Sequence, residues 1–396
     1  MSEVKLPEGY KQTEVGVIPE DWEVKDIGEA LTIKHGKDQK QVESSSGQYP
    51  IFGTGGQMGW ANNFLYNKPS VLIGRKGSIN KPRYIDVPFW TVDTLFYSQV
   101  HNGYDEKFMF YKFCLIDWMN YNEASGVPSL NASTISNVKI SVPKKLEQTA
   151  IATALSDVDN LIQSLEKLIA KKEAIKTGTM QHLLTGKTRL PEFATHENGS
   201  AKGFKQTELG RIPEDWKVVS LGEAVEFLDG QRKPIKASDR AKINGIYPYY
   251  GASGIVDYVN DYIFDEDLIL LGEDGDNILS RNSPLSFKVS GKIWVNNHAH
   301  VLRPNQNFNI TFLTSFLESL DYALLNSGTA QPKLNKATCL KIKVAKPSKN
   351  EQTAIATVLS DMDAEIQALQ QRLDKTRDIK QGMMQQLLTG KVRLAH

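Results

Sequence analysis

The sequence predicts an α+β protein with two similar globular domains of mixed α/β content, separated by a long antiparallel two-helix coiled coil. Three observations predict this fold. An internal duplication covers nearly all of the 396 residues. Each copy begins with a stretch rich in Gly, Pro and aromatic residues and continues with one in which Gly and Pro nearly vanish. In the second stretch, apolar residues recur at alternating steps of four and three.

The duplication is visible in motifs that return in the same order. KQTEVGVIPEDW begins at Lys11 and KQTELGRIPEDW at Lys205. EQTAIATALSDVDNLI begins at Glu147 and EQTAIATVLSDMDAEI at Glu351, and QHLLTGKTRL has its counterpart in QQLLTGKVRL. Repeats of this kind predict two homologous halves joined by a polar linker. The predicted boundaries are 1–146 (first head), 147–189 (central helix), 190–201 (linker), 202–350 (second head) and 351–396 (C-terminal helix).

Each head is predicted to be a compact mixture of short strands and buried helices. Short β-branched or aromatic runs such as SVLIG, YIDVPFW, DLILLG and VKISV lie between turn signals, which is typical of strands. FMFYKFCLIDWMN and ITFLTSFLESLDYALLN are predicted to be buried helices. Trp22, Trp90, Trp216 and Trp294 stand at matching places in the two copies, which favours shared core packing over base stacking.

The stretches that begin at Glu147 and Glu351 are predicted to be long helices. Their apolar steps give the 3.5-residue period of a coiled-coil seam. The seam consists of Ile151, Leu155, Val158, Ile162, Leu165 and Ile169 in the first copy, and of Ile355, Leu359, Met362, Ile366, Leu369 and Leu373 in the second. The alternative is two independent amphipathic helices, each covering its own head. Because both seams have the same length and phase, mutual packing is favoured.

Two equal seams on one chain bury each other best as an antiparallel pair related by a pseudo-twofold axis. A rod of this kind would be roughly 57 Å long. The seam weakens at Lys172 and Thr376, and Gly178 and Gly382 follow, so the last turns are expected to bend or pack differently. Small residues, among them Ala152, Ala154, Ala354 and Ala356, are expected on the outward faces, where a partner could dock, although these alanines could equally be simple helix formers.

Composition restricts the class of protein. With 40% hydrophobic and 23% charged residues and a net charge of +1, the chain resembles an ordinary soluble globular protein without a basic coat. No apolar run of membrane length occurs, and the first residues, which lack an apolar stretch, are not expected to form a secretory signal. Its two cysteines, Cys114 and Cys339, do not fall at matching places, which favours a reduced, cytoplasmic setting.

The motifs taken together resemble the specificity (S) subunit of type I restriction-modification systems. They are IPEDW in each half, VLIGRKGSI, SGVPSLN, VNNHAHVL, EQTAIA and the QHLLTGK and QQLLTGK endings. The resemblance covers essentially the whole chain. It implies two target recognition domains on double-stranded DNA, each reading half of a bipartite site, with helices that set the spacing. It also implies two methyltransferase (M) subunits and two restriction (R) subunits as partners. The complex would use S-adenosylmethionine, and ATP with Mg²⁺ for restriction.

The residues are consistent with a chain that has no active site of its own. The Asn/Asp-Pro-Pro-aromatic motif of an adenine methyltransferase does not occur. LLTGKT differs from a phosphate-binding loop because Gln181 stands where the first glycine is required, so a helix that ends at Gly186 is favoured. The histidines and cysteines show no zinc-ligand spacing, so neither a metal site nor a cofactor is predicted in this chain.

Loops with glycine and polar side chains are the predicted DNA contacts. In the first head they supply Lys34, Lys37, Gln57, Arg75, Lys76, Ser78, Ser125 and Ser129. In the second head they supply Gln231, Arg232, Lys233, Glu273, Asp274, His298, Gln331 and Lys333. Cations can donate to guanine, and Gln57 to adenine, whereas Glu273 and Asp274 could accept from the cytosine amino group. His298 and His300 alternate as on a strand, so one is expected to be structural and the other to lie near DNA.

The same residues also fit simpler interpretations. Each of these loops could be an ordinary glycine turn with solvated charges. The whole chain could be a protein scaffold whose heads bind other proteins, or a self-contained nuclease or methyltransferase. A scaffold would show no sequence preference for DNA, and a self-contained enzyme would be active when purified alone.

Overall fold

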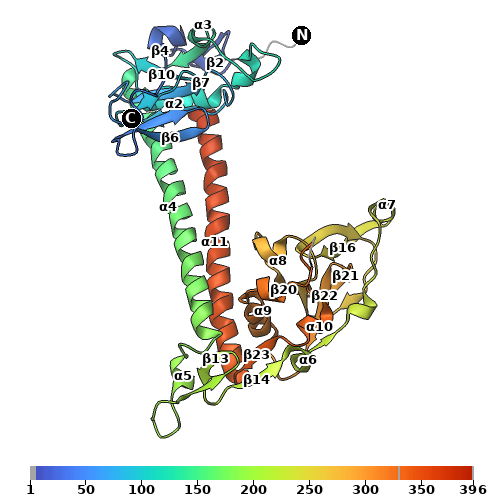
Figure 1. Ribbon diagram of the computed structural model, residues 1–396. Helices are drawn as coiled ribbons and strands as arrows, with labels where there is room; N and C mark the ends of the chain where they lie inside the picture. Colours follow the sequence, from blue (N-terminus) through green and yellow to red (C-terminus); the bar gives the residue numbers. More distant parts are fainter. Residues whose placement is uncertain (1–5, 329–330, 395–396) are drawn as a thin grey trace. The chain divides into compact units, whose positions relative to one another are not determined.

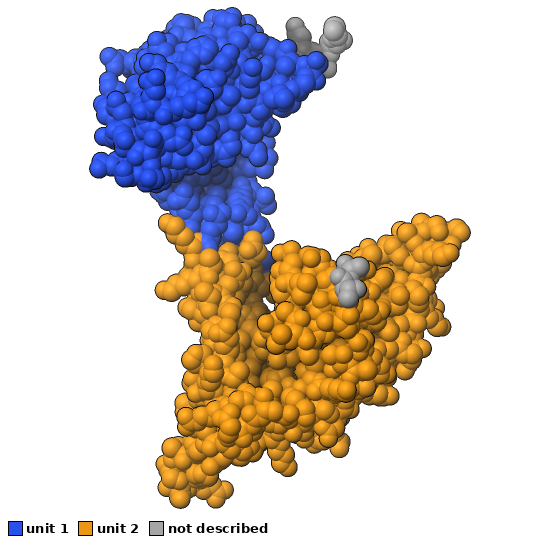
Figure 2. Space-filling view, in the orientation of Figure 1, with its two compact units in different colours: residues 1–166, 371–396 blue, residues 167–370 orange. Residues whose placement is uncertain are grey.

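The computed structural model describes residues 6–328 and 331–394. The chain divides into two compact units (Figure 2), which are residues 1–166 with 371–396, and residues 167–370. Each unit combines one head with part of both long helices. The end of the second long helix therefore belongs to the unit of the first head.

The first unit holds four small sheets (Figure 1), with strand orders β1-β2, β11-β3, β4-β10-β7-β8 and β6-β5-β9. Its strands are β1 (Tyr10–Thr13), β2 (Gly16–Pro19), β3 (Glu23–Asp26), β4 (Leu31–His35), β5 (Tyr49–Gly53), β6 (Gly56–Ala61), β7 (Ser70–Gly74), β8 (Arg83–Ile85), β9 (Trp90–Thr91), β10 (Leu95–Val100) and β11 (Lys139–Val142). Its helices are α1 (Ile27–Ala30), α2 (Glu106–Leu115), α3 (Ala132–Ser136), the 3₁₀ turn η1 (Trp118–Tyr121) and the first part of α4 (Lys145–Leu183).

The second unit repeats this plan, with sheets β12-β13, β14-β23, β15-β22-β19-β20 and β17-β16-β21-β18. Its strands are β12 (Phe204–Thr207), β13 (Gly210–Pro213), β14 (Lys217–Ser220), β15 (Val225–Phe227), β16 (Asn244–Gly251), β17 (Gly254–Val259), β18 (Phe264–Asp265), β19 (Leu268–Gly272), β20 (Ser286–Val289), β21 (Lys292–Val295), β22 (Ala299–Pro304) and β23 (Lys343–Lys346). Its helices are α5 (Pro191–Ala194), α6 (Leu221–Ala224), α7 (Ala237–Arg240), α8 (Asn277–Ser280), α9 (Ile310–Glu318), α10 (Lys336–Cys339), the 3₁₀ turns η2 (Asp229–Gln231) and η3 (Ala323–Leu325), and the first part of α11 (Lys349–Leu387).

Motifs that occur twice have the same local role in both heads. The Asn131 side chain caps α3 by accepting from the Thr134 N–H, and Asn335 caps α10 by accepting from the Thr338 N–H. The Ile51↔Trp90 pair in the parallel β5–β9 register corresponds to Tyr249↔Trp294 in β16–β21. The predicted duplication and the mixed α/β heads are therefore confirmed. Trp22 and Trp216 are buried, whereas Trp90 and Trp294 are only half-buried.

Helices α4 and α11 each span 39 residues, or about 58 Å. Residue numbers rise along α4 as those of their partners on α11 fall, so the helices run antiparallel, as predicted. The ion pairs between them are Asp159–Lys380 (2.6 Å) and Glu166–Arg377 (2.7 Å) in the first unit, and Lys172–Glu365 (2.6 Å) and Lys176–Asp363 in the second. Neither helix is interrupted at Gly178 or Gly382.

The seam positions serve two kinds of packing. Ile151 and Leu155 lie in the hydrophobic core of the first head, and Ile355 and Leu359 lie in that of the second. The rest follow the paired part of the helices, where Leu165, Ile169 and Leu373 are buried and Val158, Ile162, Met362, Ile366 and Leu369 are half-buried. The first turns of each helix thus cover their own head, and only the later turns form the coiled coil.

The outward placement expected for Ala152 and Ala356 is wrong. Both residues are buried in the core of their own head, because the first turns of each long helix pack there. Ala154 and Ala354 are half-buried. Of these four alanines, only Ala154 and Ala354 keep part of their surface available to a partner.

In each unit, four hydrogen-bonded residues join segments that are far apart in the sequence, and we call this set the clasp. The clasp consists of Asp21, Trp22, Glu147 and Arg393 in the first unit, and of Asp215, Trp216, Glu351 and Arg189 in the second. In the second clasp, Arg189 donates to Glu351 at 2.7 Å and to Asp215 at 3.0 Å, and the Trp216 indole N–H donates to Glu351 at 3.0 Å. The clasp explains why EDW, EQTA and the arginine after TGK occur twice: each unit joins all three motifs around one buried carboxylate.

A buried lysine distinguishes the first head from the second. Lys112 on α2 is buried and donates to the Ser141 hydroxyl at 3.0 Å and to the Leu388 carbonyl at 2.9 Å. At the matching place on α9, the second head has the buried Phe316. Burial lowers the pKa of Lys112 to about 7.

We expect the stability of the wild-type chain to rise with pH relative to that of a Lys112→Met variant. An unfolded lysine keeps its proton up to about pH 10, so above pH 7 the unfolded state binds more protons than the folded state. Increasing pH therefore favours folding, by up to about 1.4 kcal/mol per pH unit. The free energy of unfolding, measured with denaturant from pH 7 to pH 9, tests this. If the difference in the free energy of unfolding between the wild type and the variant does not change with pH, the prediction is wrong.

Candidate nucleic-acid interface

Two of the predicted loops in the first head are joined through their backbones. The Gly77 N–H donates to the Pro128 carbonyl at 2.8 Å, and the Leu130 N–H donates to the Arg75 carbonyl at 2.9 Å. Lys76 and Ser129 form an isolated β-bridge between the same loops. GRKGS and SGVPS, which lie far apart in the sequence, therefore form one continuous surface.

A third predicted segment meets this surface at the turn between β9 and β10. The Thr94 carbonyl accepts from the N–H groups of Arg75 (2.9 Å) and Lys76 (3.3 Å). The Lys37 N–H donates to the Thr91 carbonyl at 2.8 Å, and the Lys37 carbonyl accepts from the Trp90 indole at 2.9 Å. Trp90 thus positions the Lys37 segment.

The remaining candidates of the first head lie near this surface or apart from it. Ser78 follows in the GRKGS loop and is half-buried, and Ser125 is exposed in the SGVPS loop. Gln57 is exposed on β6, where its amide donates to the nearby Gly59 carbonyl, at 3.4 Å. Lys34 is exposed on β4, opposite Tyr97 of β10. Within the described residues, no hydrogen bond or ion pair joins Lys34 or Gln57 to the two joined loops.

The second head repeats the same backbone scaffold with different side chains. The Gly275 N–H donates to the Pro332 carbonyl at 3.1 Å, and Asp274 and Lys333 form the isolated bridge that matches Lys76–Ser129. The Lys233 carbonyl accepts from the Trp294 indole at 2.7 Å, as Lys37 does from Trp90. Gln231 and Gln331 are exposed.

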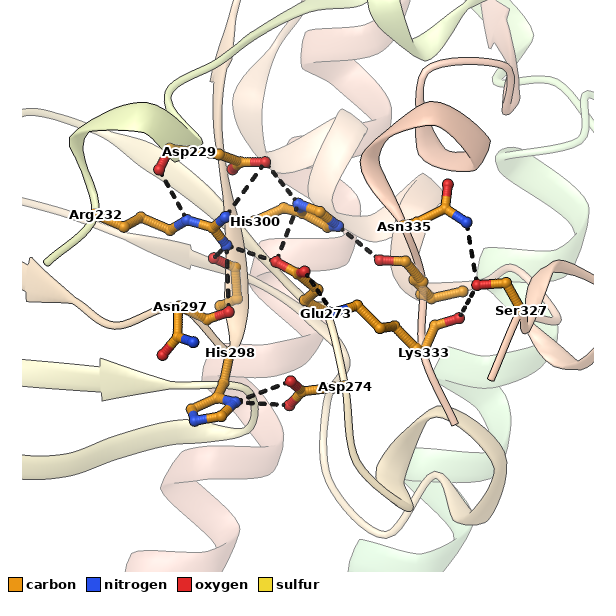
Figure 3. Close-up of polar contacts among 12 residues, drawn as sticks. Asp229, Arg232, Glu273, Asp274, Asn297, His298, His300, Ser327, Lys333 and Asn335 are labelled. Atoms are coloured by element: carbon orange, nitrogen blue, oxygen red, sulfur yellow. Dashed lines mark hydrogen bonds and ion pairs between the residues drawn. The ribbon is translucent and has the colours of Figure 1, made fainter. Parts of the chain in front are cut away.

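Three candidates of the second head are held in an ion network (Figure 3), namely Arg232, Glu273 and Lys333. The Arg232 guanidinium donates to Glu273 at 2.7 Å and to the Ala299 carbonyl at 2.8 Å. The Lys333 ammonium lies 3.3 Å from the other Glu273 oxygen. The side chains of Arg232 and Glu273 are only 14% and 13% exposed, so these two residues mainly hold the loops together.

His300 forms the buried base of this network. Its Nδ1 lies 2.8 Å from the Asp229 carboxylate and its Nε2 lies 2.9 Å from the Leu334 carbonyl (Figure 3). Both partners can only accept hydrogen bonds, so the ring must carry two protons. Burial alone would lower the pKa of His300, but its interactions with Asp229 and Cys339 together outweigh this and raise the pKa to about 10. In the first head, the matching pair in the sheet register is His35 and Phe96, with ring centroids 4.9 Å apart.

His298 points the other way from His300. It lies just before β22, its side chain is 51% exposed, and its Nδ1 is 2.9 Å from both oxygens of Asp274. The alternation of the NNHAH motif thus leaves one histidine in the core and one at the surface.

A comparison with family models identifies the family. The model described as type I restriction modification DNA specificity domain matches residues 19–176 and again residues 213–376. The chain belongs to this specificity family. The two matched segments coincide with the two copies of the internal repeat.

Relatives in the specificity family match over nearly the whole chain. The type I restriction enzyme MjaVIII specificity subunit of Methanocaldococcus jannaschii is 28% identical, over 98% of this chain and 96% of its own length. The putative MjaX specificity subunit of the same organism is 26% identical, over 98% of this chain and 97% of its own. A putative specificity subunit of Haemophilus influenzae is 35% identical over 38% of this chain and 37% of its own.

Solved structures show that the family fold is shared. The type I restriction-modification S subunit from M. genitalium superposes with a TM-score of 0.65 at 19% identity, and the match covers 97% of this chain and 98% of that one. A chain from a structure on complex assembly and conformational transition of the type I R-M system gives a TM-score of 0.51 at 13% identity, covering 95% and 99%.

Two further kinds of feature are missing from the described part of this specificity-family chain. Within residues 6–328 and 331–394, no three His, Cys, Asp or Glu side chains gather as metal ligands. Over the same residues, no helix combines the length and apolar character that a membrane span requires.

Sequence reasoning missed one of the residues that support this interface. The alternation in NNHAH singled out His300 with His298, but the partner of His300, Asp229, lies far away in the chain and does not stand out by type or spacing. The clasp residues did carry a signal, because each occurs in a motif that is present twice. The signal indicated shared architecture but not which motifs touch.

Proposed function

We propose that this chain is the DNA recognition subunit of a type I restriction-modification complex, in which each head reads one half of a bipartite, asymmetric site. One observation carries the proposal: the two heads share a loop scaffold but present unlike side chains on it. Lys76 in the first head corresponds to Asp274 in the second. A shared scaffold gives both heads the same way of approaching a base pair, and unlike side chains give them different preferences.

The long helices have two roles in this proposal. A rod of about 58 Å exceeds one turn of B-DNA, about 34 Å, which suits two half-sites separated by a few unread base pairs. The helices would also dock two M subunits. Two R subunits would join for cleavage.

The chain itself would be non-catalytic. The M subunits would bind S-adenosylmethionine, and the R subunits would use ATP with Mg²⁺. The complex would act on double-stranded DNA in the cytoplasm. Its recognition chain would thus supply the choice of site, and its partners the chemistry.

The proposal is tested by producing the chain with its cognate M subunit and mapping methylated adenines across the host genome. We expect one gapped motif with two unlike halves. Methylation without a sequence preference would contradict the proposal and favour a scaffold role. Methylation or cleavage of DNA by the purified chain alone would favour a self-contained enzyme.

A further inference from the structure

The two acidic residues of the GEDGD loop in the second head differ in availability. Glu273 is engaged by Arg232 and Lys333, and it lies 3.7 Å from the buried His300 ring. Its backbone is fixed as well, because the Glu273 carbonyl accepts from the Leu334 N–H at 2.8 Å. With 13% of its side chain exposed, Glu273 supports the loop and has little surface to offer to a base.

Asp274 has one side-chain partner among the described residues, and that partner faces solvent. Both of its carboxylate oxygens lie 2.9 Å from His298 Nδ1. The Asp274 side chain is 20% exposed, whereas that of His298 is 51% exposed. Figure 3 shows the His298 ring turned away from the Arg232–Glu273 network, with its second nitrogen free of any drawn contact.

Two hydrogen bonds fix the backbone of His298. Its N–H donates to the Asn296 side chain at 2.7 Å, and its carbonyl accepts from the Glu273 N–H at 2.8 Å. In the first head, the Thr94 carbonyl receives the matching bond from the Arg75 N–H at 2.9 Å. The same backbone arrangement thus places Lys76 beside Thr94 in the first head, and Asp274 beside His298 in the second.

We propose that His298 reads one base pair in the half-site of the second head, and that Asp274 is its positioning residue. The proposal rests on the function proposed above. An ionised carboxylate can only accept, so the hydrogen bond to Asp274 places a proton on Nδ1. In its neutral form the ring then presents Nε2 as an acceptor. The group that it fits is an exocyclic amino group in the major groove, N6 of adenine or N4 of cytosine.

The test uses the chain in complex with its M subunit and measures methylation rates on duplexes with each base pair at every position of the second half-site. For His298→Ala we expect the preference at one base pair to fall by about 5- to 100-fold, the range for loss of one specific base contact. The other positions and the first half-site should keep their preferences. Asp274→Asn should affect the same position less, because the Asn oxygen still accepts from Nδ1. Glu273→Gln should leave all preferences unchanged and lower the melting temperature.

A second arm tests the amino group directly. Duplexes that carry purine in place of adenine, or pyrimidin-2-one in place of cytosine, lack that group at the position found. Wild-type complexes should methylate them more slowly by a similar factor, and His298→Ala complexes should not distinguish them from the natural duplex.

Three results would overturn the assignment of His298. They are unchanged preferences in His298→Ala, loss of preference at every position of the second half-site, and a change in the first half-site. Loss throughout the second half-site would mean that the pair supports the loop instead of reading a base. A wild-type complex without any sequence preference would instead refute the proposed function.

Discussion

Replacing Arg189 by methionine is expected to destabilise the chain by about 3–5 kcal/mol, the range for breaking a buried ion pair from one side. The Arg189 side chain is 6% exposed and that of Glu351 is 2% exposed. Without Arg189, the buried Glu351 carboxylate would keep only the Trp216 indole N–H as a partner from the clasp. Thermal or denaturant unfolding of the purified chain measures the loss.

Two other arginines provide graded controls. Arg377 donates to Glu166 at the same 2.7 Å distance, but both side chains are about half exposed, so Arg377→Met should cost no more than about 1 kcal/mol. Arg393, in the first clasp, is 36% exposed, so the loss of stability in Arg393→Met should lie between the losses in the other two variants. Equal losses for Arg189→Met and Arg377→Met would show that the clasp is an ordinary surface ion pair.

A second large loss of stability is expected when the glycines that end the long helices are replaced. Gly186 and Gly390 have φ of +69° and +73°, as is common for a residue that ends a helix. A Cβ on Gly186 would lie 2.3 Å from Pro213 Cδ, and one on Gly390 would lie 2.5 Å from Pro19 Cδ. Left-handed backbone costs an alanine roughly 1–2 kcal/mol, and overpacking roughly 1–3 kcal/mol more. We expect Gly186→Ala and Gly390→Ala each to lose about 2–5 kcal/mol.

Gly178→Ala is the matched control, because Gly178 lies inside α4 and a Cβ there would meet nothing within 4 Å. Alanine is the better helix former by about 0.5–1 kcal/mol, so this change should stabilise the chain. The two kinds of glycine should therefore shift the melting temperature in opposite directions. Destabilisation by Gly178→Ala, or tolerance of Gly186→Ala, would contradict the packing described here.

Periodicity and repetition predicted the parts of this fold that depend on local sequence. The seam of α4 and α11 follows from residue spacing alone, and the caps at Asn131 and Asn335 lie in motifs that occur twice. The sequence did not predict that the end of a long helix from one copy packs in the head of the other copy. Leu387 and Leu388, at the end of the second copy, pack in the core of the first head. Periodicity identifies a buried face but does not identify the surface that covers it.

The candidate interface was predicted at the level of loops and less well at the level of side chains. Glycine-containing loops with polar residues were identified, and the structure joins GRKGS to SGVPS and GEDGD to QPK. Their charges gave no indication of which side chains face inward. Arg232 and Glu273 neutralise each other inside the second head, whereas His298, also a predicted contact, faces the surface.

An exchange of one head is the most direct test of the central claim that each head reads its own half of the site. Residues 1–145 would be replaced by the first head of another family member that has IPEDW, so that Pro19 and Trp22 still meet the end of α11. The methylated motif would then be mapped with the same M subunit. We expect a new first half beside an unchanged second half and an unchanged gap. A motif altered in both halves would contradict it.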